Sequence, residues 1–260
     1  METSFRNIFI NSTLAFVSAF IFTTFIHEFG HYVSYWLFGA DPTLFHNYVQ
    51  TPDQPLTIPV RVISALAGPV VSLVQGIVFG LVVSRREKNT GSHLFFLWLS
   101  LLGFVSFFGY LVVTPLSTTG DTGMVAELLN IDYTIRVLIA VLGMIVLLWT
   151  ILKTAKTFSR FIPVQHDLKM RAKYVYHLMF FPIIIGSVVN TLLAFPVVSF
   201  LSILYPAMSP YVIMSSFSVI LKTSNSKMSS PECEKHIKQS LLFLALCAIL
   251  LNRLLTFGIG

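Results

Sequence analysis

The chain has 260 residues, of which 55% are hydrophobic and 11% are charged, and its mean hydropathy is +0.79. A soluble domain carries about 25% charged residues, so the composition excludes an ordinary soluble protein and favours a multi-pass membrane protein. We expect one integral membrane domain over 1–260, an all-α bundle in contact with the lipid bilayer, and no nucleic-acid partner despite the net charge of +6.

A spanning helix needs about 20 apolar residues. In chain order, about six spans are expected, at 8–38, 60–83, 94–116, 135–152, 177–204 and 240–259. The first is too long for a straight span, so part of it is expected to tilt or to project. The stretch PAMSPYVIMSSFSVIL, 206–221, is short and rich in Ser and Pro, which leaves open a re-entrant or interfacial segment or a further crossing.

Basic residues in the connecting segments indicate an orientation. Segments 84–93 and 153–173 contain several Lys and Arg, whereas 39–59 and 117–134 contain none. The positive-inside rule then places the N-terminus and both basic segments in the cytosol, with the chain in the cell membrane. Segment 205–239 fits less well, because six spans would place its four lysines outside.

The first expected span carries ionisable groups in TTFIHEFGHYVSYW, 23–36. Such groups are costly in lipid and mark functional sites. His27 and His31 are four residues apart, which on a helix puts both imidazoles on one face, about 6 Å apart along the axis. Two imidazoles at this spacing can bind one Zn²⁺, with Glu28 beside the metal to act on a water. The alternative is a pair of interfacial histidines next to an aromatic belt.

The segment after the first span is punctuated by Pro. Its pieces TLFHNYVQ, 43–50, and PLTIPV, 55–60, are candidate short strands on either side of a TPDQP turn. An extended element beside HEFGH would be able to pair with an unwound substrate backbone. A plain surface loop is the favoured alternative for this segment.

The second expected span begins with SALAGPVVSLVQG, 64–76. Gly and Ala allow close helix approach, while Pro69 frees backbone groups for a partner. Ser72 and Gln75 are candidates to orient a substrate backbone or a metal-site carboxylate. We assign Pro69 and Ser72 to substrate binding, with ordinary small-residue packing as the alternative, most of all for Gln75.

A catalytic zinc needs a third protein ligand. The third expected span ends in LVVTPLSTTGDTGM, with Asp121 between two glycines. Spans one and three run in the same direction, so their C-terminal ends share one side of the membrane, and Asp121 can meet His27 and His31 there. The alternative is a loop aspartate in a Gly-rich turn.

The fifth expected span holds Asn190 in GSVVNTLLAFP. Asn190 is a candidate substrate-binding residue that reaches the metal cavity, and an interhelical hydrogen bond is the commoner use of such an Asn. Pro182 and Pro196 are expected to kink this span, and a mobile span would gate lateral substrate entry. The other histidines show no HxxH or HxxHH spacing, which argues against a di-iron desaturase.

Together, HEFGH on one membrane helix, AGPVVS on the next and TP…GDTG after the third resemble the site-2 protease family of intramembrane zinc metalloproteases. The resemblance covers about residues 20–125, the family's three-helix core, and 126–260 would add further helices. It implies that His27, His31 and Asp121 bind Zn²⁺ and that Glu28 is the general base.

The sequence also departs from the family pattern. Thr114 stands where the family has Asn, Gly120 replaces a Leu, and Thr122 replaces the Gly after Asp121. No PDZ domain is inserted and no nucleotide-binding module is appended. The family's site usually lies nearer the cytosolic face, whereas the loop charges place this one nearer the other face.

The leading hypothesis is a zinc metalloendopeptidase that hydrolyses peptide bonds of membrane-anchored protein substrates. One alternative is an inactive relative that binds membrane partners or holds a structural metal. Another is a transporter for a metal or small solute, with HEFGH as a pathway site. Transport ranks last, because the fourth and sixth expected spans offer almost no polar residues at their centres.

Overall fold

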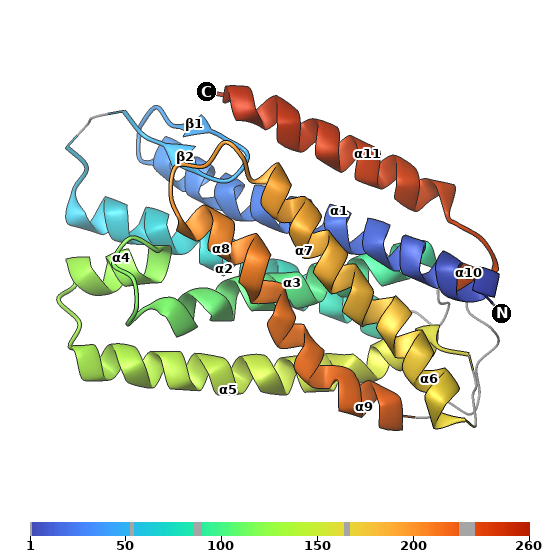
Figure 1. The fold of residues 1–260 in the computed structure, drawn as a ribbon. Helices are drawn as coiled ribbons and strands as arrows, with labels where there is room; N and C mark the ends of the chain where they lie inside the picture. Colours follow the sequence, from blue (N-terminus) through green and yellow to red (C-terminus); the bar gives the residue numbers. More distant parts are fainter. Residues whose placement is uncertain (1, 53–54, 86–89, 164–166, 224–231) are drawn as a thin grey trace.

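The computed structural model describes residues 2–52, 55–85, 90–163, 167–223 and 232–260. This part of the chain is helical apart from one two-stranded sheet (Figure 1). The elements are α1 Glu2–Leu37, β1 Thr43–Leu44, β2 Val49–Gln50, α2 Ile58–Ser84, α3 Gly91–Val113, α4 Asp121–Leu128, α5 Tyr133–Phe158, α6 Leu168–Val175, α7 Phe181–Leu193, α8 Leu201–Met208, α9 Phe217–Lys222, α10 Glu232–Lys235 and α11 Gln239–Leu254. Short stretches of 3₁₀ or π helix extend several of them, at Ser159–Phe161, Tyr176–Phe180, Ser209–Ser216 and Leu255–Phe257.

Seven helical segments in the described residues are long and apolar enough to cross a membrane. They are Glu2–Leu37, Ile58–Ser84, Gly91–Val113, Tyr133–Phe161, Leu168–Leu193, Leu201–Lys222 and Gln239–Phe257. The expected helical membrane bundle is confirmed, and the chain has the architecture of a multi-pass membrane protein. The expected number of spans, about six, is one too low.

The fifth and sixth candidate spans correct the sequence-based boundaries. The span expected at 177–204 begins earlier, at Leu168, and ends at Leu193. It ends there because Pro196 has no N–H to continue the helix and disfavours helical geometry at the residue before it. The stretch 206–221 is part of the separate segment Leu201–Lys222, which is long enough for a full crossing and is not limited to a short dip.

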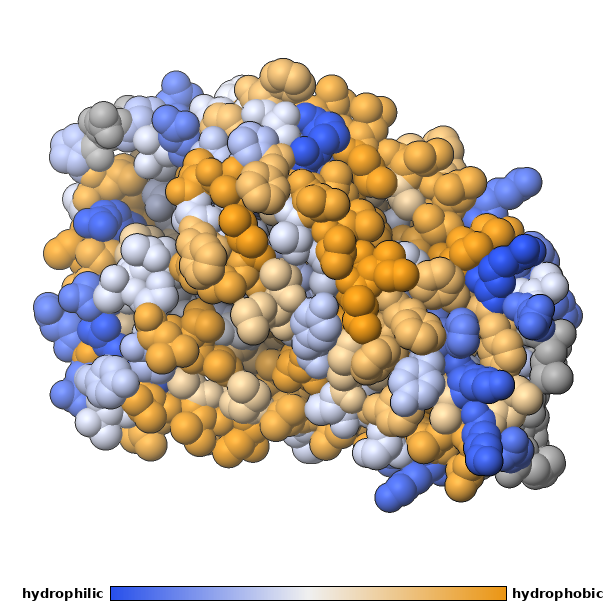
Figure 2. All heavy atoms as spheres, in the orientation of Figure 1, coloured by the Kyte–Doolittle hydropathy of each residue, from blue (hydrophilic) through white to orange (hydrophobic). Residues whose placement is uncertain are grey.

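The bundle has two polar ends. The N-terminus, α6, α9 and α10 lie at one end, and α4, the β-hairpin and the C-terminus lie at the other (Figure 1). Hydrophobic side chains dominate the middle of the face in Figure 2, and hydrophilic ones gather towards both ends. With seven crossings, Lys222 at the end of α9 and Lys235 in α10 both lie at the N-terminal end, so the poor fit of segment 205–239 to the six-span topology disappears. Of the basic segments, residues 86–89 and 164–166 lie outside the described residues.

Helix α1 is the central element and packs against α2, α3, α7 and α11. With 36 residues it is about 54 Å long, which exceeds the roughly 30 Å hydrocarbon core of a bilayer and agrees with the expectation that part of it projects or tilts. Trp98 stacks edge-on against Phe16 of α1 and Phe158 of α5, and these three rings form the centre of the core.

The π-helical turn Tyr176–Phe180, which joins α6 to α7, is also anchored on α1. Pro182 has no N–H, so the carbonyl of Leu178 loses its helical partner. The hydroxyl of Ser12 donates to that carbonyl, and the indole N–H of Trp98 donates to the Ser12 oxygen at 3.1 Å. This bond holds the π-helical turn Tyr176–Phe180, which contains Leu178, against the core. The helix is therefore irregular near Pro182, as the sequence predicts, and the carbonyl that Pro182 frees is hydrogen-bonded.

A small sheet covers the end of the bundle next to HEFGH. Strands β1 and β2 both lie within 43–50, so the expectation that 55–60 forms the second strand is wrong. Helix α2 begins at Ile58 instead, with Pro59 at its first turn. Residues 53–54 of the expected TPDQP turn lie outside the described residues. Ile259 bridges to Leu44, so β1 is paired on both sides.

Candidate metal centre

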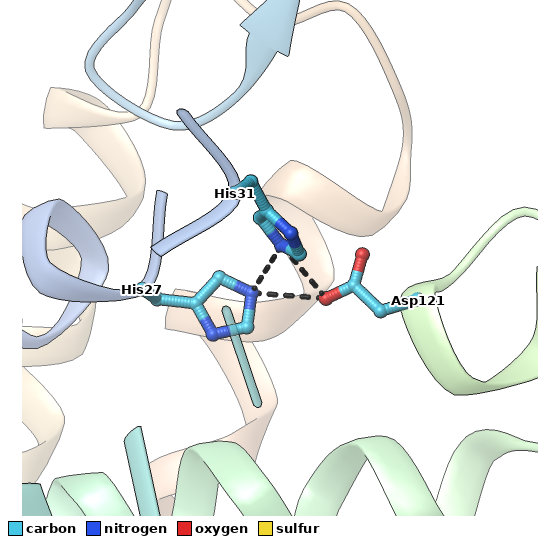
Figure 3. Close-up of side chains that lie close together, drawn as sticks. All are labelled: His27, His31 and Asp121. Carbon is cyan, nitrogen blue, oxygen red and sulfur yellow. Dashed lines mark hydrogen bonds and ion pairs between the residues drawn. The ribbon is translucent and has the colours of Figure 1, made fainter. Parts of the chain in front are cut away.

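Three side chains from α1 and α4 converge at one point. The imidazoles of His27 and His31 and the carboxylate of Asp121 point toward one another (Figure 3). Asp121 Oδ2 lies 2.9 Å from His27 Nε2 and 3.3 Å from His31 Nε2, and the two Nε2 atoms are 3.2 Å apart. The sequence predicts that Asp121 meets His27, 94 positions earlier, where the first and third spans end on the same side. The structure confirms that the two side chains lie close together.

These separations match the spacing of zinc ligands. Ligands at about 2.0–2.1 Å from a tetrahedral Zn²⁺ lie about 3.3 Å from one another. The circle through the three atoms described above has a radius of about 1.8 Å, so a point about 2 Å from all three exists. The residues present therefore fit a zinc ion.

The outer nitrogens of both imidazoles are occupied. His31 Nδ1 lies 2.7 Å from the carbonyl oxygen of Ser64, which can only accept, so Nδ1 donates and Nε2 keeps its lone pair. His27 Nδ1 lies 3.0 Å from the hydroxyl of Ser72, which leaves His27 Nε2 facing the carboxylate of Asp121. Two lone pairs and a carboxylate oxygen this close repel one another unless a proton or a metal cation lies between them. Metal-ligating histidines are oriented by such outer partners.

Asp121 is the first residue of α4 and is fixed by its neighbours. The Thr122 hydroxyl donates to the Tyr110 carbonyl at 2.7 Å, and the Thr114 hydroxyl lies 2.8 Å from Thr122 Oγ1. Burial alone would raise the pKa of Asp121. When the site holds a proton in place of a metal, the positive charge of His31 and hydrogen bonds with both imidazoles outweigh burial and hold that pKa below its usual range. The carboxylate is therefore ionised, as a metal ligand must be.

Thr114 and Thr122, which depart from the family pattern, are thus hydrogen-bonded to each other. We expect Thr122→Val to weaken zinc binding roughly tenfold to a hundredfold, because it removes the bonds that orient Asp121. Thr122→Ser keeps the hydroxyl and should restore most of the affinity. Competition with a chromogenic zinc chelator measures both, and equal affinity in Thr122→Val and the wild type would refute this role.

Helix α2 approaches the centre so closely that only glycine fits at position 68. A Cβ on Gly68 would lie 2.3 Å from His31 Nε2 and 2.8 Å from His27 Nε2. The next residue, Pro69, leaves the Ala65 carbonyl without its helical donor, and Ala65 borders the cavity described below. The AGPVVS segment therefore provides both the room for the imidazoles and a freed backbone acceptor nearby.

A cavity of about 350 Å³ opens on the centre, and Glu28 lines it together with the three ligand residues. Glu28 is buried and interacts electrostatically with His27, His31 and Asp121. The ring of Tyr110 stacks on His27, with centroids 5.0 Å apart and planes 8° from parallel. Further lining residues come from α1 to α4, the β-hairpin, α7, α8 and α11, and from the loops before α4 and after α7.

The residues expected to bind substrate have different positions. Ser72 is fully buried with its hydroxyl on His27, so its place suits the orientation of a ligand and not contact with substrate. Gln75 donates to Thr23 and to the Leu99 carbonyl, which is helix packing. Pro69 is buried in α2, and its contribution is the Ala65 carbonyl that its missing N–H leaves without a helical donor. Asn190 does line the cavity, and its amide donates to the Gly186 carbonyl on its own helix and not across to another.

Some residues of the site escaped the sequence analysis. Ser106, whose hydroxyl lies 3.4 Å from His27 Nδ1, and Tyr110 are one turn apart on α3. That spacing, with polar groups on one face of an otherwise apolar span, is a signal that would have identified them. Tyr205, which lines the cavity from α8, follows no motif that a single sequence reveals.

The chain was compared with known proteins, and no family model, no curated protein and no solved structure matches it. The likeness of HEFGH, AGPVVS and GDTG to site-2 proteases is therefore carried by those residues alone. The family assignment stays a hypothesis, and the function is argued from the site.

Proposed function

We propose that the chain is an intramembrane zinc metalloendopeptidase of the site-2 protease type. The observation that carries this proposal is the convergence of His27, His31 and Asp121 at zinc-ligand spacing, on a cavity that Glu28 also lines. Within the described residues the metal-binding group offers three ligands, and three protein ligands with an open position are typical of catalytic zinc, whereas structural zinc takes four.

Each residue then has a chemical role. Bound zinc would polarise the scissile carbonyl and lower the pKa of a water to about 7. Glu28 accepts a proton from the attacking water and later gives it to the leaving amine. The Ser64 carbonyl keeps His31 in the tautomer that ligates through Nε2, and the Ser72 hydroxyl holds the ring of His27 in place.

The substrate is a membrane-anchored protein whose helix unwinds locally, since the carbonyls of an intact helix are hydrogen-bonded. Tyr48 and Val49 line the cavity, and Val49 begins strand β2. In the described part of the chain, β2 pairs with β1 and leaves its other edge open. This edge supports the earlier hypothesis that an extended substrate adds a strand next to the metal centre.

The charges of the two ends support a cytosolic N-terminus in the cell membrane. Basic residues of α6, α9, α10 and the N-terminal end face the cytosol under the positive-inside rule. Asp121 begins α4, and hairpin residues line the same cavity, so the metal centre lies toward the end of the bundle where Figure 1 shows α4 and the hairpin. Under this orientation, the site opens toward the non-cytosolic face, which is the reverse of the family's usual arrangement.

Metal removal tests the proposal. The purified full chain in proteoliposomes is expected to cleave a co-reconstituted single-span peptide, to lose at least about 99% of that activity after chelation, and to regain it with one equivalent of Zn²⁺. Cleavage that survives complete metal removal would overturn the mechanism. Bound zinc without cleavage of any membrane peptide would favour the inactive relative with a structural metal, and zinc flux across the vesicle would favour a transporter.

A further inference from the structure

The last candidate span holds one charged residue, Arg253, to which the hydrolysis described above assigns no role. An ionisable side chain inside a span is costly, and its partner indicates its use. Arg253 donates to the Leu193 carbonyl and, at 2.8 Å, to the Phe195 carbonyl. Both carbonyls lie where α7 ends, so they have no donor within that helix, and a cation at a helix C-terminus is favourable. Arg253 therefore joins α11 to the end of α7.

The carbonyl between these two is bonded to the β-hairpin, residues 43–50. His46 Nε2 donates to the Ala194 carbonyl at 2.8 Å, and Asn47 Nδ2 donates to the same oxygen at 3.0 Å. His46 and Asn47 are both among the residues that line the cavity of the metal centre. Three successive carbonyls at the end of α7 thus connect the hairpin to α11.

A second attachment joins the hairpin to the residues that follow α11, next to β1 in Figure 1. The Leu44 N–H donates to the Ile259 carbonyl at 2.8 Å, and the Ile259 N–H donates to the Leu44 carbonyl at 2.9 Å. Gly258 permits this approach, because its φ is +78° and a Cβ there would lie 2.8 Å from Thr43 Cγ2 and 2.9 Å from Phe45 Cε1. The hairpin is therefore held at two separate points.

The second attachment also decides which edge of the hairpin a substrate reaches. Because the N–H and carbonyl of Leu44 bond Ile259, the outer edge of β1 is closed. Opposite residues in an antiparallel pair alternate between exchanging hydrogen bonds and not exchanging them. Val49, the partner of Leu44, therefore points its N–H and carbonyl away from β1. Val49 also lines the cavity, so the edge left open within the described residues is the one beside the metal centre.

We propose that Arg253, Gly258 and Ile259 form a clamp that positions the hairpin for substrate binding. The proposal rests on the proteolytic function proposed above and gives α11 a part in substrate affinity. None of the three clamp residues is among the described residues that line the cavity, and the metal ligands belong to α1 and α4. Loss of the clamp is therefore expected to weaken substrate binding while zinc affinity is unchanged.

A matched pair of substitutions at Ile259 tests the clamp. Ile259→Pro removes the N–H that bonds the Leu44 carbonyl, whereas Ile259→Val keeps it. Each is made in the full chain that carries Glu28→Gln and is loaded with zinc, and a fluorescent single-span peptide is titrated without turnover. Ile259→Pro is expected to lower peptide affinity roughly tenfold, as loss of a hydrogen bond would give. Ile259→Val is expected to stay within about twofold of its parent.

Arg253→Gln tests the other attachment, because Gln cannot reproduce the two bonds of the guanidinium. It is also expected to lower peptide affinity roughly tenfold or more, since the bonds lost are charge-assisted. Phe257→Ala is the matched control on the same segment, because Phe257 is 84% exposed, and it should bind peptide as its parent does. Chelator competition is expected to give zinc affinities within about twofold of the parent in all four variants, since the clamp is separate from the ligands.

Hydrogen exchange measures the position of the hairpin without any substrate. The amides of residues 43–50 are expected to exchange roughly tenfold faster in Ile259→Pro and Arg253→Gln, because the bonds that hold the hairpin are missing, while exchange in α1 is unchanged. Peptide affinity that neither variant lowers, or hairpin exchange that neither variant raises, would overturn the clamp. Zinc affinity that falls as much as peptide affinity would overturn it as well, because the defect would then not be confined to the hairpin.

Failure of the clamp is distinct from failure of the proposed hydrolysis, because neither the titration nor the exchange measurement involves turnover. A wild-type chain that cleaves no membrane peptide, while peptide affinity still depends on the N–H of Ile259, would retain the clamp and reject the protease. Cleavage by the wild type together with equal peptide affinity in Ile259→Pro and Ile259→Val would retain the protease and reject the clamp.

Discussion

Replacing Glu28 with Gln is expected to lower the rate of peptide hydrolysis by about 10²- to 10⁴-fold while zinc stays bound. A carboxamide has nearly the shape of a carboxylate but cannot accept the proton of the attacking water, and general-base catalysis contributes a factor of this size. The three ligand residues are unchanged by the substitution, and Glu28 lies in the cavity beside them. Initial cleavage rates in proteoliposomes, with zinc content measured on the same samples, give both quantities.

Glu127→Gln is the matched control for this substitution. Glu127 is an exposed partner of Arg136, at 3.0 Å, and does not line the cavity. Its loss should leave cleavage within about twofold of the wild type, because an exposed ion pair contributes little. A Glu28→Gln variant that retains zinc and cleaves at the wild-type rate would contradict the role of Glu28 as general base.

Gly68→Ala is expected to abolish zinc binding even though it changes no ligand. The added methyl would lie 2.3 Å from His31 Nε2 and 2.8 Å from His27 Nε2, where the metal and its ligands belong. Either the imidazoles rotate away or α2 retreats from α1, and both movements break the spacing of the three ligand atoms. We expect zinc affinity to fall more than a hundredfold and cleavage to fall with it.

Gly109→Ala separates this effect from a general intolerance of glycine replacement in the helices. Gly109 is on α3, and a Cβ there meets nothing within 4 Å. This variant should bind zinc as the wild type does, as measured by chelator competition. Zinc bound at wild-type affinity by Gly68→Ala would show that the close approach of α2 does not define the centre.

The arrangement of the candidate ligands followed from the sequence because helix geometry is local and strict. A spacing of four residues puts His27 and His31 on one face of any helix. The approach of Asp121 needed one more inference, that alternate spans share an end. Both steps use only the periodicity of the α-helix and the alternating direction of the spans. The structure brings the three side chains together.

Other features depend on contacts between distant segments that no motif marks. Thr114 and Thr122 each depart from the family pattern, and only the structure shows that they bond to each other and to the Tyr110 carbonyl. Ser and Pro interrupt the apolar residues of the sixth candidate span, Leu201–Lys222, so the sequence alone leaves open whether it crosses the membrane.

X-ray absorption at the zinc K-edge of the purified full chain tests the central claim most directly. One zinc per chain is expected, with two imidazole nitrogens and carboxylate oxygen at about 2.0–2.2 Å. Asp121→Ala, which removes the carboxylate, should weaken binding and change that first shell. A wild-type chain that binds no zinc, or a zinc shell without imidazole that Asp121→Ala leaves unchanged, would contradict the assignment of His27, His31 and Asp121 as one metal centre.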